Sequence, residues 1–89
     1  MPEQSTTICN RRGLHARAAG KLVQTAARYK SAVTLITKGR EVNARSILGV
    51  MMLAAGIGTP VTLRAEGEDA ELALEALIGL FDRGFDEED

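Results

Sequence analysis

The residue best suited to do chemistry in this 89-residue chain is its only histidine, His15. The spacing of apolar residues predicts a helix that begins just after it, and the first N–H groups of a helix have no intrahelical partner. Those N–H groups and the helix dipole together form a site for an anion. A neutral imidazole at that place can act as a nucleophile, and a negative group attached to the ring would face the free N–H groups.

Three neighbours of His15 fit the same chemistry. Arg17 lies in the first predicted helical turn, where its planar guanidinium would suit phosphate oxygens. Arg12 lies upstream in a basic loop, and Gly13 permits unusual backbone angles and the close approach of a partner. These residues predict a surface site for a phosphoryl group carried on His15. The alternative is that His15 is a polar residue that only flanks or caps the helix.

A second feature is the uncharged segment 46–56. It predicts a short helix over residues 47–54 with apolar side chains all round, which must be buried or leave an apolar patch exposed. A small two-layer domain cannot easily cover all its sides, so we expect an exposed patch that binds other proteins. A fully buried helix is the alternative. The residues expected to face outward are Ile47, Leu48, Met51 and Met52.

Ser46 stands at the start of this predicted helix. Its hydroxyl is suited to cap the helix, and it is also a candidate for regulatory phosphorylation. A phosphate there would place about two negative charges on the predicted binding surface. An acidic partner would then be repelled.

Charge is divided unevenly along the chain, although the net charge is −1. Residues 1–45 carry nine Lys or Arg against two Glu, a balance of +7, whereas residues 46–89 carry two Arg against ten acidic residues, a balance of −8. The basic side chains form either a plain solvated surface or a patch that attracts an anion or an acidic partner. Those around the histidine are Arg11, Arg12, Arg17, Lys21 and Arg28.

Composition excludes several other functions. The length predicts one domain, residues 1–89, with a modest core and no deep substrate pocket. Cys9, the only cysteine, cannot form an internal disulfide and is expected to be buried in a strand of a cytoplasmic protein. No apolar run is long enough to enter a membrane, and no cluster of ligands predicts a metal. With three aromatic residues and an acidic pI of about 5.8, nucleic-acid binding is not expected.

Hydrophobic periodicity predicts an α+β fold with the order β-α-β-β-α-β-α. Strands are expected at residues 6–9, 32–37, 40–43 and 61–66, and helices at 16–28, at 47–54 and after 67–69. This pattern favours an antiparallel sheet with helices on one face. The acidic C-terminal residues, about 84–89, are expected to be frayed.

Two segments resemble a known family. Gly13-Leu14-His15-Ala16-Arg17 resembles the active-site signature of the HPr family, the histidine-containing phosphocarriers of the bacterial phosphotransferase system. Ser46-Ile47-Leu48-Gly49-Val50-Met51 resembles the regulatory-serine segment of that family, at the usual spacing. Both the sugar-transport and the nitrogen-related branches use such carriers. The resemblance implies an open-faced β-sandwich, with a four-stranded antiparallel sheet and three helices on one face.

The resemblance also implies a function. Enzyme I, charged by phosphoenolpyruvate, would phosphorylate Nδ1 of His15, and the group would pass to an enzyme IIA domain. Arg17 would stabilise the phosphoryl group, and Ser46 would match the site of an HPr kinase/phosphorylase. The protein would be a monomeric carrier and no independent enzyme, without a cofactor or metal. The predicted partner surface consists of Arg12, Ala18, Lys21, Ile47, Leu48, Met51 and Met52.

One residue departs from the family pattern, because Ala18 stands where relatives commonly have Pro after the arginine. Ala is a good helix former and keeps an N–H group that Pro lacks, so we expect the site to survive.

The alternative function is a regulatory docking adaptor that acts through the apolar second helix without phosphoryl transfer.

Overall fold

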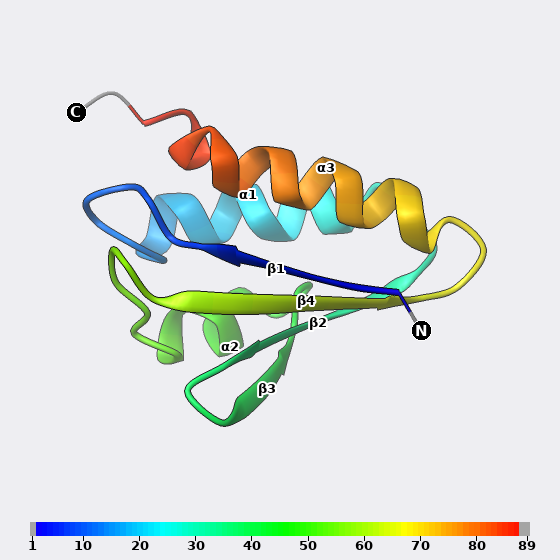
Figure 1. The fold of residues 1–89 in the computed structure, drawn as a ribbon, viewed down its shortest axis with the longest axis horizontal. Helices are drawn as coiled ribbons and strands as arrows, with labels where there is room; N and C mark the ends of the chain where they lie inside the picture. The colour runs from blue at the N-terminus through cyan, green and yellow to red at the C-terminus, as the bar shows by residue number, and fades with distance from the viewer. Residues whose placement is uncertain (1, 88–89) are drawn as a thin grey trace.

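A computed structural model describes residues 2–87 of the chain. Its elements follow the predicted order, and a short 3₁₀ turn, η1, is added after the last helix (Figure 1). The elements are β1 (Glu3–Thr7), α1 (Ala16–Ala26), β2 (Ala32–Thr37), β3 (Arg40–Asn43), α2 (Ile47–Met52), β4 (Pro60–Glu66), α3 (Ala70–Asp82) and η1 (Gly84–Asp86).

The four strands form one antiparallel sheet in the order β1-β4-β2-β3. β4 is a central strand, and its Leu63 lies opposite Gln4 of β1 on one side and Leu35 of β2 on the other. Helices α1 and α3 run side by side over the sheet, while α2 contacts α1 and β3 (Figure 1). The predicted α+β fold class is therefore confirmed.

Alternation along the central strands decides which face of the sheet carries the core. Residues 33, 35 and 37 of β2 and residues 61, 63 and 65 of β4 are buried, whereas the residues between them are partly exposed. The buried residues of all three helices belong to the same hydrophobic cluster, among them Leu22 of α1, Val50 of α2 and Phe81 of α3. The helices thus cover one face, and the other face stays open, as the sequence predicted.

The bounds of several elements differ from the prediction. β1 ends at Thr7, which pairs with Pro60, so Cys9 lies beyond the sheet and is exposed rather than buried in a strand. α1 ends at Ala26, because the next residues turn toward β2. α2 ends at Met52, and Ala54 with a φ of +50° cannot continue a right-handed helix.

The expected fraying of the C-terminal residues is wrong for residues 84–87. Phe85 is fully buried, and its ring packs edge-on against Phe81 with the centroids 4.9 Å apart. Its backbone has a φ of +57°, a left-handed conformation that is costly for a large side chain. Burial of the ring, about 1.5–3 kcal/mol, offsets the cost of that backbone conformation. Residues 88 and 89, also expected to be frayed, lie outside the described residues.

Gly13 fixes the course of the loop that leads to His15. Its φ is +64°, and a Cβ atom at this position would lie 2.3 Å from the carbonyl oxygen of Ala55. The next residue, Leu14, donates its N–H to that same oxygen at 2.9 Å. The close approach that Gly13 permits is therefore made by another segment of the same chain.

This contact predicts a large cost for the substitution Gly13→Ala. The left-handed φ costs about 1–2 kcal/mol for a residue with a Cβ, and the clash with Ala55 adds about 1–3 kcal/mol. Gly39→Ala is the matched control, because Gly39 has a φ of +73° but no atom within 4 Å of the place that a Cβ atom would take. Equilibrium urea denaturation should show the larger loss of unfolding free energy for Gly13→Ala. Equal losses would contradict the steric role of Ala55.

Candidate functional site

His15 is the N-cap residue of α1. Its backbone is extended, with φ −77° and ψ −178°, and its carbonyl oxygen accepts the N–H of Ala19 at 2.8 Å. The ring turns back over the helix start, where Nδ1 accepts the N–H of Arg17 at 3.4 Å. The imidazole is one-quarter exposed. His15 therefore caps the helix, and the same geometry presents its ring at the helix N-terminus.

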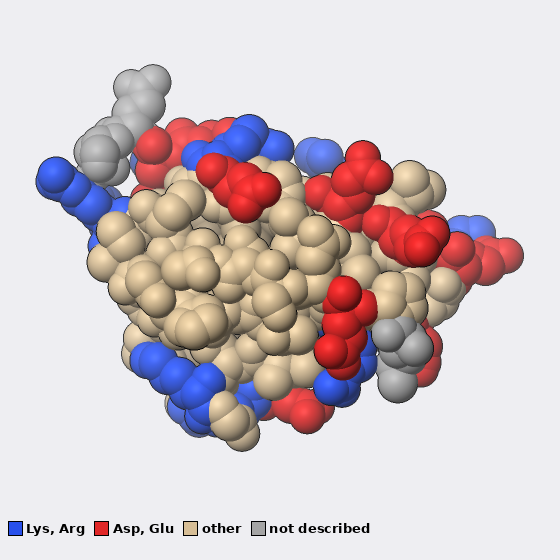
Figure 2. All heavy atoms as spheres, in the orientation of Figure 1, with Lys and Arg blue, Asp and Glu red and all other residues tan. Residues whose placement is uncertain are grey.

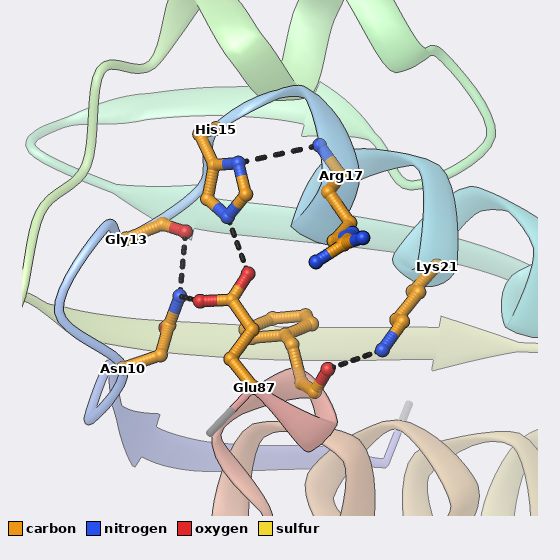
Figure 3. Close-up of polar contacts among 7 residues, drawn as sticks. Asn10, Gly13, His15, Arg17, Lys21 and Glu87 are labelled. Atoms are coloured by element: carbon orange, nitrogen blue, oxygen red, sulfur yellow. Dashed lines mark hydrogen bonds and ion pairs between the residues drawn. The ribbon is translucent and has the colours of Figure 1, made fainter. Parts of the chain in front are cut away.

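The first turn of α1 supplies donors beside Nδ1. Helix geometry leaves the N–H groups of Ala16, Arg17 and Ala18 without intrahelical acceptors. The Arg17 residue is exposed, and its guanidinium makes no hydrogen bond or ion pair within residues 2–87 (Figure 3). The histidine, the backbone donors and the guanidinium that the sequence predicted are thus found together at the N-terminus of α1.

The opposite edge of the His15 ring meets the C-terminal segment. Nε2 and the Glu87 carboxylate oxygen Oε2 form a hydrogen bond (Figure 3). The other carboxylate oxygen of Glu87 accepts the amide of Asn10 at 3.0 Å, and that amide also donates to the Gly13 carbonyl at 2.9 Å. Sequence reasoning missed both Asn10 and Glu87. The signal that could have found Glu87 is the single apolar Phe85 within the acidic run.

These contacts change the acidity of Glu87. Burial of its side chain favours the protonated form, but hydrogen bonds from Asn10 and His15, with the positive charge of Arg12, outweigh that effect. They hold the pKa of the Glu87 carboxyl below its ordinary value. The carboxylate is therefore ionised at neutral pH.

The predicted basic residues do not all gather around the ring. The Lys21 ammonium donates to the Phe85 carbonyl oxygen at 2.6 Å, so it holds the C-terminal turn (Figure 3). Arg28 follows the far end of α1, beyond roughly 14 Å of helix between Arg17 and Ala26. Figure 2 shows acidic side chains prevailing toward the right-hand end of the face drawn, away from the loop before α1.

The α2 surface is made of the four exposed apolar side chains of that helix. Leu48 and Met52 are the most exposed, at 66% and 61%, while Val50 and Leu53 turn into the core. The predicted outward patch is present, and the alternative of a fully buried helix does not hold. The α2 surface comprises Ile47, Leu48, Met51 and Met52.

A shallow hollow of about 320 Å³ connects the α2 surface with His15. Arg12, His15 and Met51 are among the residues that line it. Ala18 does not reach this region, because its side chain is fully buried in the core. The position of Ala18 therefore does not support the prediction that its side chain contacts a partner.

Ser46 caps α2, as predicted. Its hydroxyl oxygen accepts the N–H of Gly49 at 3.1 Å, and the residue is exposed beside the α2 surface.

Within residues 2–87 no three His, Cys, Asp or Glu side chains are grouped so that they could hold a metal ion. Over the same residues, no helix combines the length and the apolar character needed to cross a membrane.

Comparison with known proteins places the chain in a family. The model of the PTS HPr component phosphorylation site matches residues 2–83. Phosphocarrier protein HPr of Xylella fastidiosa strain Temecula1 is 53% identical over 88 residues, which is 99% of each chain. Phosphocarrier protein NPr of Shewanella violacea is 44% identical over 96% of this chain and 93% of its own. The crystal structure of HPr-C-His from Thermoanaerobacter tengcongensis superposes with a TM-score of 0.95 at 43% identity, over the whole of both chains.

The fold and site are those of a small phosphoryl carrier, and the chain belongs to the HPr family of phosphotransferase-system (PTS) phosphocarriers. Its function is to carry a phosphoryl group between enzymes of that system, and it is not an independent catalyst.

The lowered pKa of Glu87 predicts how stability depends on pH. A carboxyl with a lower pKa in the folded state stabilises the fold at neutral pH, and this contribution is lost as pH falls through the folded-state pKa. Between about pH 7 and about pH 3, the unfolding free energy of Glu87→Gln should fall less than that of the wild type. Urea denaturation across this range measures the difference. Parallel curves would show that Glu87 has the same pKa in both states.

Proposed function

We propose that Nδ1 of His15 accepts the phosphoryl group from Enzyme I and passes it to an enzyme IIA domain. The observation that carries this proposal is the position of Nδ1 at the N-terminus of α1, beside the N–H of Arg17 at 3.4 Å. This hydrogen bond is long and weak, so the lone pair of Nδ1 is easily released for attack. A P–N bond then forms at Nδ1 while the bond between phosphorus and the donor group breaks.

The helix start and Arg17 would stabilise the transferred group. A phosphoryl group on Nδ1 would lie beside the N–H groups of the first turn, which have no intrahelical acceptors, and the helix dipole favours negative charge there. The exposed guanidinium of Arg17 is free to turn toward the phosphoryl oxygens and to bind two of them. The site stays open, so the same group can be handed on.

The α2 surface and Arg12 are suited to bind both partner enzymes. The hollow between His15 and Met51 makes the reacting ring and the apolar patch one continuous region. An apolar centre bordered by basic side chains fits a partner with an apolar contact surface and acidic groups around it. We propose that the protein does this in the cytoplasm as a monomer, because one chain supplies every group of the site.

The direct test is transfer of radiolabelled phosphate from phosphoenolpyruvate through Enzyme I. The wild type should take up label that is stable to alkali and lost in acid, and His15→Ala should take up none. Leu72→Ala, at an exposed residue of α3 outside the α2 surface, is the control and should take up label as the wild type does. No label on the wild type with an active cognate Enzyme I would contradict the proposal and favour the docking adaptor.

We also propose that phosphorylation of Ser46 by an HPr kinase/phosphorylase regulates this transfer. The Ser46 hydroxyl is exposed and stands next to Ile47 of the α2 surface. About two negative charges at that place would repel an acidic partner without removing any group of the His15 site.

The variants Ser46→Asp and Ser46→Asn separate charge from capping. Asp and Asn cap helices about as well as Ser, so both variants should fold equally. Phosphorylation of His15 by Enzyme I should be several-fold slower in Ser46→Asp, about equal to wild type in Ser46→Asn, and the difference should shrink as salt screens the charge. Equal rates in both variants at low salt would contradict regulation through this charge.

A further inference from the structure

The segment that carries Glu87 is held to the body of the protein at several points. Phe85 is buried, Lys21 donates to the Phe85 carbonyl oxygen, and the N–H of Glu87 donates to the Gly84 carbonyl at 3.1 Å. The side chain of Glu87 is itself only 8% exposed. Its carboxylate is therefore held against the His15 ring and is largely shielded from solvent.

Asn10 fixes the orientation of that carboxylate. The Asn10 residue is 6% exposed, and its amide nitrogen donates both to Gly13 and to Glu87. Its amide oxygen has no hydrogen-bond partner among the described residues. The reverse orientation would bring this oxygen against two acceptors, so the amide can only donate toward Glu87. Oε1 of Glu87 is thereby occupied, and Oε2 is left to face the ring.

The contact with Glu87 determines which ring nitrogen of His15 carries the proton. An ionised carboxylate can only accept hydrogen bonds, so Nε2 must be the donor. A neutral ring protonated on Nε2 has its lone pair on Nδ1. The other edge of the ring gives the same answer independently, because Nδ1 accepts the N–H of Arg17. Both contacts thus select the tautomer in which Nδ1 is the nucleophile.

We propose that Glu87 is a positioning residue for phosphoryl transfer, which fixes the tautomer of His15 and stabilises its phosphorylated ring. When the lone pair of Nδ1 forms the P–N bond, Nε2 keeps its proton and the ring becomes cationic. The Glu87 carboxylate then faces this positive charge from the edge opposite the phosphoryl group. The Glu87 side chain is largely shielded from water, and this makes its interaction with the ring stronger than it would be in solution. This inference rests on the proposed role of His15 as the acceptor.

The test compares Glu87→Gln with Asp86→Asn in the full-length protein. Both variants remove one negative charge from the same turn, but Asp86 pairs with exposed Arg83 and does not touch His15. The side-chain amide that Glu87→Gln introduces has one acceptor oxygen, which cannot serve both Asn10 and His15, so it should hold the ring less well. Two properties are measured: the ¹⁵N and ¹H signals of the His15 ring, and the rate of phosphorylation by Enzyme I.

The wild type and Asp86→Asn should show a protected proton on Nε2, an unprotonated Nδ1, and rates within about twofold of each other. Glu87→Gln should exchange its Nε2 proton faster, populate the other tautomer, and react about tenfold more slowly, as expected for loss of a hydrogen bond to a charged group. Ring signals and rates unchanged in Glu87→Gln would overturn the proposal. A faster Glu87→Gln would also overturn it, since the carboxylate would then obstruct His15.

Two outcomes separate this inference from the proposed function. If the wild type takes up no label, the acceptor role of His15 fails, whatever the tautomer is. If the wild type is labelled but Glu87→Gln is slower with unchanged ring signals, the acceptor role stands and the positioning role fails. In that case the loss of rate would come from the turn alone.

Discussion

The close packing of Gly13 against Ala55 is the contact on which the arrangement of the site depends. It joins the loop before α1 to the segment after α2, and the hydrogen bond from Leu14 to the Ala55 carbonyl fixes the distance between them. Ile8 adds two more hydrogen bonds to this segment, with the N–H of Gly58 and the carbonyl of Thr59. Because of these contacts, the His15 ring and the apolar patch of α2 lie on one surface.

A third segment completes the site from the other side. The C-terminal turn brings Glu87 against the edge of His15 that faces away from the helix start. The ring therefore lies between backbone donors at one nitrogen and a carboxylate at the other. A negative charge close to a phosphoryl site would ordinarily oppose binding, but this one lies across the ring from Nδ1, where it would face the positive charge that the proposed transfer creates.

The openness of the site follows from the size of the protein and from its task. A chain of 89 residues buries too little surface to enclose a substrate. A carrier must also give up its phosphoryl group to the next enzyme, so donors that are few and exposed are an advantage. The hydrogen bond at Nδ1 is long, and within residues 2–87 the Arg17 guanidinium makes no hydrogen bond or ion pair. Both features suit such a site, because no strong contact among these residues has to break first.

The sequence determined the secondary-structure elements and the position of the histidine proposed to react. Apolar and polar residues alternate in β2 and β4, and this alternation predicted the sheet and its buried face. The helical spacing of apolar residues in α1 predicted that the helix starts next to His15. Both patterns depend only on residues close together in the chain. The exposed α2 surface followed from composition, because an uncharged helix in a small domain cannot be wholly covered.

Tertiary structure alone decided the position of the C-terminal residues. The acidic composition predicted a solvated tail, but one buried ring, Phe85, outweighs the charges around it. The partners of Glu87 are Asn10 and His15, more than seventy residues earlier in the chain, and no local pattern signals contacts of that range. Likewise, Ala18 could be placed on the helix but not on its buried side until α1 was packed against the core. Local spacing specifies elements, whereas long-range contacts depend on how those elements pack.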